Sequence, residues 1–191
     1  MSKPIYKNAL RSKRMIREAF FELIQKKDIS QIKIKEIIEL ADISKGTFYA
    51  HYQDIYAVYE DIENENIHNI VEYLNEFSSD LVKTDFLPFI DKIFDYVEQN
   101  KTSYIKLFSS SVTFQFMDKL QGVFVSCMMS NKKLVSGFES EIVAKQFFGF
   151  IAVGTACLMR NYFLNENAQP LEEVKRNLNQ CILYGLNGIK S

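Results

Sequence analysis

The sequence predicts an all-α fold in which a small helical head precedes a larger helical body. Apolar residues recur at helical spacing along most of the 191 residues, and only residues 112 to 116 and 123 to 125 alternate as strand formers do. Three Pro and seven Gly rarely interrupt these patterns. An apolar fraction of 47% is sufficient for a hydrophobic core and argues against a disordered chain.

The head and the body differ in charge, although the whole chain carries a net charge of −1. Residues 1 to 53 contain eleven Lys and Arg against six Asp and Glu, a net charge of +5. Residues 54 to 191 contain twelve against eighteen, a net charge of −6. Because the phosphates of duplex DNA attract cations and repel acids, this division favours a head that faces DNA and a body that does not.

Two short helices joined by a tight turn are predicted between residues 32 and 52. The first spans about residues 34 to 41 and repeats its apolar residues at helical spacing. The second opens at Ser44, a good N-cap, and carries Phe48 and Tyr52 on its inner face. This is the geometry of a helix-turn-helix, whose second helix lies in the major groove of DNA. A plain helical hairpin with solvated polar side chains is the alternative.

The second helix carries residue types that suit a DNA surface. Lys45 offers a cation and Thr47 a hydroxyl, while Gly46 lets the backbone approach the duplex closely. Ala50 is the expected position for operator choice, because a methyl group can contact thymine. The predicted DNA contacts are Lys33, Ser44, Lys45, Gly46, Thr47, Tyr49, Ala50 and His51.

The run from Ser44 to Tyr52, SKGTFYAHY, resembles the recognition motif of the TetR family of bacterial transcriptional regulators. The resemblance covers about residues 12 to 59. It implies a DNA-binding domain in residues 1 to 53 and a helical ligand-binding and dimerisation domain in residues 54 to 191. It also implies a homodimer that binds a palindromic operator and is controlled by a small apolar or aromatic effector. A repressor is expected, and an activator is compatible with the same residues.

Four positions depart from the usual pattern of that family, and one of them is Ile38, which replaces an alanine and is expected to deepen the small core. Lys33 stands where a threonine usually caps the first helix of the motif, so a phosphate contact there would be made by a point charge. Asp42 replaces a glycine in the turn, and Asp tolerates the left-handed conformation better than most residues. Ile55 replaces a lysine that contacts phosphate.

The segments that flank the motif are predicted as an arm and two helices. Residues 1 to 11 are interpreted as a flexible basic arm. A helix over residues 12 to 27 presents Lys13, Arg14 and Arg17 on an outer face that could follow the DNA backbone. A longer helix, from about residue 54 to about residue 81, connects the head to the body.

The body is expected to contain five helices, over residues 86–97, 104–108, 113–129, 139–164 and 170–189, with a loop over 130–138. Its Met and aromatic side chains suit an apolar cavity, although an ordinary helical core would use the same residues. The candidate ligand-binding residues are Tyr104, Phe108, Phe114, Met117, Phe124, Met128, Phe148, Met159 and Tyr162.

The last two helices are the expected dimer interface, as the family resemblance implies. Small residues on one side of the first would allow another helix to approach closely, and the second has a continuous apolar stripe. A monomer that buries both stripes internally is the alternative. The candidate interface residues are Gly149, Ala152, Val153, Ala156, Arg160, Leu171, Val174, Leu178, Ile182 and Leu186.

Other classes of protein find little support. The three Cys fall into no metal-binding spacing and suit a reduced, cytoplasmic compartment. We expect no catalytic residues, no metal and no cofactor, and no membrane span. Two alternatives to a regulator stay open: a helical protein that binds a small molecule, and an adaptor that binds another protein through the stripe at residues 171 to 186.

Overall fold

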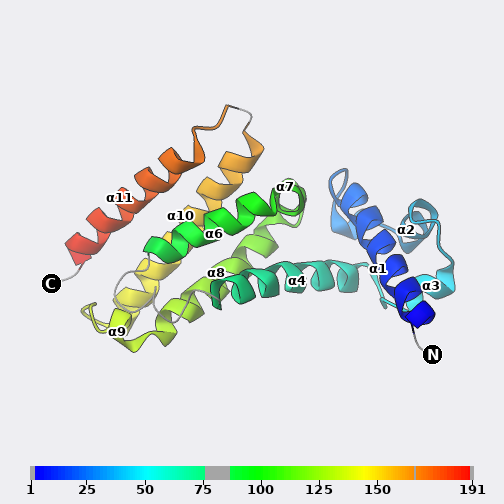
Figure 1. Ribbon diagram of the computed structural model, residues 1–191, viewed down its shortest axis with the longest axis horizontal. Helices are drawn as coiled ribbons and strands as arrows, with labels where there is room; N and C mark the ends of the chain where they lie inside the picture. The colour runs from blue at the N-terminus through cyan, green and yellow to red at the C-terminus, as the bar shows by residue number, and fades with distance from the viewer. Residues whose placement is uncertain (1–2, 76–86, 166, 190–191) are drawn as a thin grey trace. The chain divides into compact units, whose positions relative to one another are not determined.

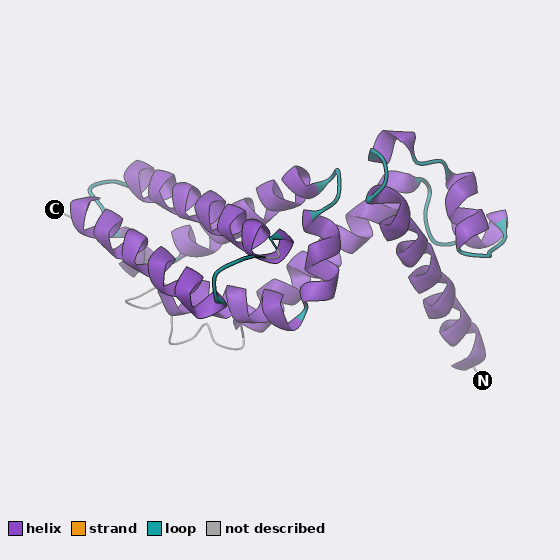
Figure 2. Ribbon diagram, turned by 90° about the horizontal axis from the view of Figure 1, so that it is seen from above, coloured by secondary structure: helices purple, strands orange, loops and turns teal. Residues whose placement is uncertain are grey.

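The computed structural model describes residues 3–75, 87–165 and 167–189. Within these ranges every regular element is a helix and no strand occurs, which confirms the all-α fold (Figures 1 and 2). The chain divides into two compact units at Ile67 and His68, inside one helix, and residues 109–113 also belong to the first unit. This division lies fourteen residues beyond the domain boundary expected at residue 53.

The first unit begins with α1 (Lys3–Ile24), a 3-10 helix η1 (Ile29–Gln31), α2 (Ile34–Leu40) and α3 (Lys45–Tyr49). The first part of α4 (Ile55–Asn75) completes it. α1 packs against α2, and α2 packs against α3. The core of this unit consists of fully buried apolar side chains, among them Ile16, Phe20, Ile37, Phe48 and Val58.

The basic arm predicted over residues 1 to 11 is wrong for residues 3–11, because α1 already begins at Lys3. Pro4 is tolerated there, since the first turn of a helix does not need its N–H groups. The Ser12 hydroxyl donates to the carbonyl oxygens of Asn8 and Ala9, at 3.0 and 3.1 Å. These hydrogen bonds reach back one turn, so Ser12 lies within the helix and not at its start. The helix ends at Ile24, three residues before the predicted end.

In the part of the chain that the structure describes, the second unit contains the end of α4 and six further helices. These are α6 (Leu87–Gln99), α7 (Lys101–Phe108), α8 (Thr113–Ser130), α9 (Lys132–Val135), α10 (Glu141–Leu164) and α11 (Leu171–Ile189). Of these helices, α8 begins at the last residue of the first unit. α10 packs against α7 and α11, and α11 also packs against α6 (Figure 1). The five predicted body helices therefore exist, each within a few residues of its expected limits.

One loop predicted in the body contains a helix, and the predicted end of the connecting helix lies outside the described residues. The loop predicted over residues 130 to 138 contains α9, because Asn131 caps it by accepting a hydrogen bond from the Leu134 N–H at 3.2 Å. The side chain of Leu134 is buried and anchors this short helix. The helix predicted to run to about residue 81 is described as far as Asn75, and residues 76–81 lie outside the described residues.

α11 is held to α6 by a buried lysine. Lys175 is almost fully buried, and its Nζ donates hydrogen bonds to Asp95 on α6 and, at 3.1 Å, to Glu172 on its own helix. Burial disfavours the charged lysine, but the two carboxylates outweigh this effect and raise its pKa. One turn further on, the Asn179 amide donates to Asp91 at 3.1 Å. The polar contacts therefore fix one side of α11 to α6.

α10 is the central helix of the second unit. By length and composition it is apolar enough to cross a membrane, contrary to the expectation that no segment approaches a span. Its side chains nevertheless include a buried row through Ala144, Phe148, Ile151 and Thr155. This row accounts for the apolar residues on one side of α10, but only 39% of its apolar stretch is buried within the subunit, so apolar side chains also lie on its outer face.

Candidate DNA-binding surface and ligand cavity

The turn between α2 and α3 is made by Asp42. Its φ of 49° lies in the left-handed region, as predicted for an Asp that replaces glycine. The helix before it closes with the Ala41 N–H bonded to the Ile37 carbonyl at 2.8 Å, and the Ile43 N–H bonds to the Ile38 carbonyl at 3.2 Å. The left-handed residue thus lets the chain leave α2 at Leu40 and start α3 at Lys45, after four residues.

The start of α2 is capped without help from the side chain of Lys33. A lysine side chain has no acceptor, and the Glu36 carboxylate instead accepts the Lys33 backbone N–H at 2.9 Å. Lys27 Nζ also donates to both oxygens of Glu36, at 2.5 and 2.6 Å. Hydrogen bonds from Lys27 and from the Lys33 backbone lower the pKa of Glu36. The exposed side chain of Lys33 is left available for a phosphate.

α3 presents a polar, exposed face. Ser44 Oγ accepts the Thr47 backbone N–H at 3.0 Å, which confirms Ser44 as the N-cap. Phe48 is fully buried and anchors the helix from the inside. Lys45 Nζ lies 5.9 Å from the centroid of the Tyr49 ring, within range of a cation–π interaction. Five of the predicted DNA contacts on this segment are exposed, namely Ser44, Lys45, Gly46, Tyr49 and Ala50. The other two, Thr47 and His51, are half-buried.

His51 is attached to α1. Its Nε2 lies 2.8 Å from Ser12 Oγ, so the residue predicted to contact DNA also joins the end of the helix-turn-helix to the first helix. Nearby, the Asp54 carboxylate accepts the Ala57 N–H at 2.8 Å at the start of α4. Ile55 is buried. The position of the family's usual lysine is therefore part of the core here.

Three side chains contact the carboxylate of Asp61 on α4. Tyr52 Oη donates to its Oδ2 at 2.8 Å, Lys13 Nζ donates to its Oδ1 at 2.8 Å, and Arg17 lies 3.7 Å away. Arg17 also pairs with Glu65. Burial opposes ionisation of Asp61, but the hydrogen bonds from Lys13 and Tyr52 outweigh this and lower its pKa.

The outer face predicted for α1 is thus corrected. Lys13 and Arg17 have carboxylate partners on α4, so they are not free to follow the DNA backbone. Arg14 pairs with Glu18 on its own helix at 3.7 Å, and both side chains are well exposed. Exposed pairs of this kind are weak, so Arg14 can exchange its partner for a phosphate.

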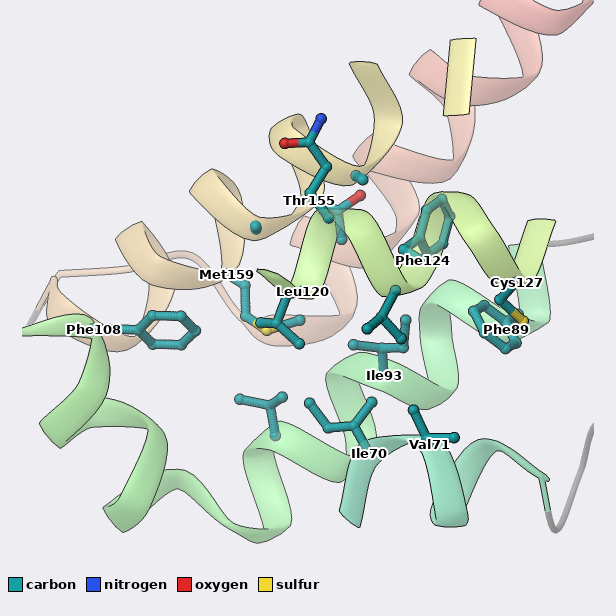
Figure 3. Close-up of a pocket in the computed structure, with 15 residues that line it drawn as sticks. Ile70, Val71, Phe89, Ile93, Phe108, Leu120, Phe124, Cys127, Thr155 and Met159 are labelled. Carbon is teal, nitrogen blue, oxygen red and sulfur yellow. The ribbon is translucent and has the colours of Figure 1, made fainter. Parts of the chain in front are cut away.

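The second unit encloses a cavity of about 140 Å³ (Figure 3). The cavity lies between α4, α6, α8 and α10, and Phe108 at the end of α7 closes one end. Of the predicted ligand-binding residues, Phe108, Phe124 and Met159 line it. The described residues that line it are Ile70, Val71, Phe89, Ile93, Val97, Phe108, Leu120, Gln121, Val123, Phe124, Cys127, Ala152, Thr155, Ala156 and Met159.

A family model described as the C-terminal region of transcriptional regulators of the TetR type matches residues 84–184 of this chain. The match covers more than half of the sequence and includes most of the cavity wall. The chain belongs to the TetR family. Its helix-turn-helix and its helical second unit are therefore those of a TetR-family transcriptional regulator.

Relatives agree with this assignment. YxbF of Bacillus subtilis strain 168, an uncharacterised helix-turn-helix-type transcriptional regulator, is 38% identical over 47 residues. This match covers 25% of the chain but only 12% of that protein. A TetR regulator from Streptococcus agalactiae has a TM-score of 0.63 at 18% identity, over 95% of this chain and 99% of that one. The fatty acid degradation regulator FadR from Bacillus halodurans has a TM-score of 0.63 at 14% identity, over 92% and 96%. At these identities the two structures support the fold alone.

The other predicted ligand residues of this TetR-family chain lie elsewhere. Phe114 points outward with 78% of its surface exposed. Tyr162 lines a separate surface groove with Pro170. The remaining four are buried in the core without reaching the cavity, namely Tyr104, Met117, Met128 and Phe148. Sequence reasoning missed Ile70, Ile93 and the small residues of α10, because an aromatic-rich pattern does not show which positions leave a space.

Five of the ten predicted interface residues of this TetR-family chain are buried within one subunit. Leu178, Ile182 and Leu186 are buried within the subunit, where α11 packs on α6 and α10. Ala152 and Ala156 line the cavity. The Arg160 Nε donates to the Phe108 carbonyl at 3.2 Å inside the subunit. Leu171 and Val174 are half-buried.

The outward-facing row of α10 includes two of the predicted interface residues, Gly149 and Val153. Ile142, Phe150 and Val153 are exposed, and Phe150 is 76% exposed. Together with Gly149 they line a shallow groove on the outside of α10. Tyr184 on α11 is 77% exposed. Because α10 is apolar on nearly all sides, its sequence period does not show which face lies inside, and the structure assigns the outer face to this row.

Proposed function

We propose that this chain is a sequence-specific transcriptional regulator, in its simplest form a repressor, that binds a palindromic operator as a homodimer. The observation that supports this most directly is the exposed polar face of α3, held in place by Phe48 and by the Ser44 cap. A short helix presented in this way suits entry into the major groove. A repressor acts by occupying its operator and needs no further contact with the transcription machinery.

The proposed contacts divide into those that position the protein and those that read sequence. Lys45, Lys33 and the Tyr49 hydroxyl are suited to phosphates, which carry no sequence information directly. Thr47 and Ala50 are suited to base edges, the first through its hydroxyl and the second through contact with a thymine methyl. His51 would reach a phosphate while its Nε2 stays with Ser12.

Dimerisation follows from the same proposal. A single helix-turn-helix reads few base pairs, whereas two related by a twofold axis read half-sites about 34 Å apart. The exposed row Ile142, Phe150 and Val153 on α10, with Tyr184 on α11, provides apolar surface for a twofold contact between these helices. Gly149 within the row lets the helices approach closely.

The cavity supports control by a small molecule. A ligand that binds one conformation of the second unit better than another shifts the population between them and changes operator affinity by that difference. We propose that this regulator works in the cytoplasm, with DNA and a small effector as its partners, and that it is neither an enzyme nor dependent on a cofactor.

The test is selection of duplex DNA by the purified chain, followed by titration at several salt concentrations. We expect a palindromic site and an affinity that falls steeply with salt. Lys45→Ala should weaken binding to all sequences, while variants at Thr47 or Ala50 should change which site is preferred. Lys133→Ala, on α9 in the second unit, is the matched control and should leave binding unchanged.

Failure to select a palindrome, or equal affinities for the Lys45→Ala and Lys133→Ala variants, would contradict the regulator proposal. The cavity favours one second candidate, a helical protein that binds a small molecule without acting on DNA. That candidate gains support if a ligand binds the second unit and no salt-dependent operator binding is found.

A further inference from the structure

The wall of the cavity is almost wholly apolar. Among the residues that the structure describes, none of the fifteen lining side chains is Asp, Glu, Lys, Arg or His, and their oxygen and nitrogen atoms come from Gln121 on α8 and Thr155 on α10. Burial raises the pKa of the Cys127 thiol, so this side chain is also neutral at pH 7. Figure 3 shows the aromatic rings of Phe89, Phe108 and Phe124 around the aliphatic side chains.

Because the described residues of this wall carry no charge, they restrict the charge that a ligand can carry. A buried carboxylate, phosphate or ammonium group loses its hydration and needs an opposite charge or several hydrogen bonds in return. The helices that form the wall use their backbone groups internally, so they offer little to an ion. An uncharged ligand meets no such penalty.

The volume restricts the ligand further. The cavity measures about 140 Å³. A cavity of about 150 Å³ lined by aliphatic and aromatic side chains stays dry and binds benzene. The inner space between the helices therefore suits a single six-membered ring with a small substituent.

The polar side chains provide the third restriction. Thr155 is 7% exposed, and its hydroxyl oxygen is buried without a hydrogen-bond partner among the described residues. Leaving a buried hydroxyl unpaired is unfavourable. A Thr in a helix adopts either of two rotamers, so the hydroxyl of Thr155 can turn toward a bound molecule. Gln121 lines the same cavity, but its Nε2 lies 3.7 Å from the position that a Cβ on Gly149 would take, beside the groove on the outside of α10 that Gln121 also lines.

We propose that the cavity binds an uncharged molecule with one ring and one hydroxyl or carbonyl group, which exchanges a hydrogen bond with the Thr155 hydroxyl. The proposal rests on the regulator function, because this molecule would be the effector of operator binding. It narrows that function by naming the size, charge and polar group of the ligand, and by making Thr155 a specificity residue.

Three probes of similar shape test the proposal by calorimetric titration into the full chain: p-cresol, toluene and benzoate. We expect p-cresol to bind roughly fivefold more tightly than toluene, the effect of one neutral hydrogen bond. Benzoate should bind at least about tenfold more weakly than p-cresol, because its carboxylate has no partner in the wall. Equal affinities for p-cresol and toluene, tighter binding of benzoate, or no binding of either neutral probe would overturn the proposal.

Two variants locate the site. Thr155→Val keeps the shape of the side chain without its hydroxyl and should make the affinities for p-cresol and toluene equal. Thr102→Val, at an exposed position of α7, is its matched control and should keep the fivefold difference. Ala156→Leu fills the cavity and should abolish binding of both neutral probes. Unchanged selectivity in Thr155→Val places the polar contact elsewhere and overturns the assignment, even if Ala156→Leu fails to fold.

Operator binding without any probe is measured on the same samples. Loss of operator binding with intact p-cresol selectivity contradicts the regulator function and supports the ligand class. Operator binding with no selectivity among the probes contradicts the ligand class and supports the regulator function. The two proposals can therefore fail separately.

Discussion

Tyr52, three residues after the end of α3, donates a 2.8 Å hydrogen bond to Asp61 on α4. The same carboxylate accepts a hydrogen bond from Lys13 on α1, so one side chain joins three parts of the first unit. We expect Asp61→Asn to lower the free energy of unfolding by about 1–2 kcal/mol, since it removes the negative charge that Lys13 and Tyr52 face. Urea unfolding followed by circular dichroism measures this change.

Glu60→Gln is the matched control for this prediction. Glu60 is the neighbouring acid on α4, and its side chain is exposed, so its substitution should change the unfolding free energy by less than about 0.5 kcal/mol. Equal effects of the two variants would mean that Asp61 acts only through the net charge of the unit. The contacts of its carboxylate would then not contribute to stability.

The lowered pKa of Asp61 predicts that the free energy of unfolding depends on pH. The pKa of Asp61 is lower in the folded chain than in the unfolded one, so its ionised form stabilises the fold at pH values above about 3.9, the ordinary value for Asp. This stabilisation is lost as the pH falls through the folded pKa. The difference in unfolding free energy between wild type and Asp61→Asn should therefore be constant from about pH 5 to 7 and shrink below about pH 4. A difference that stays constant down to about pH 2 would contradict this assignment.

The turn residue Asp42 gives a prediction about backbone strain. Its φ of 49° suits glycine, which has no Cβ to clash in this region. Asp42→Gly should keep or raise stability, whereas Asp42→Ala should lower it by about 1 kcal/mol, because Ala lacks the polar side chain that helps Asp adopt this conformation. Thermal unfolding of the two variants gives the comparison. A more stable Ala variant would show that the turn is not strained.

Asp42 and Asp61 also show what could be learned from the sequence. The turn, the Ser44 cap and the buried Phe48 depend on residues within about one helical turn of each other, and local patterns predicted them. The contact of Asp61 with Lys13 spans 48 residues, and no local pattern indicates it.

The body shows a second limit of sequence reasoning. Helix positions there were predictable from apolar spacing, but α10 is apolar on nearly all sides. The spacing therefore does not distinguish the buried Ala156, which lines the cavity, from the exposed Val153 three residues earlier. Which aromatic side chains surround a space, and which fill the core, depends on packing between helices that lie far apart in the sequence.

The exposed row on α10 predicts how the oligomeric state can be changed. Phe150→Glu places one charge on each subunit of the proposed twofold interface, so the two charges meet or are buried together. We expect a monomer with unchanged helical content and an operator affinity lowered at least about tenfold, because two heads are no longer held together. Light scattering gives the mass, and a gel-shift titration gives the operator affinity.

Two further variants separate an interface from the core. Phe114→Glu changes an equally exposed phenylalanine on α8 and should leave the mass unchanged. Ile182→Glu changes a residue of α11 that is 1% exposed, and it should unfold the second unit because a buried charge without a partner costs more than about 3 kcal/mol. If Ile182→Glu instead gives a folded monomer and Phe150→Glu stays dimeric, the subunits meet through the stripe that this structure buries. The outer row of α10 would then need another role.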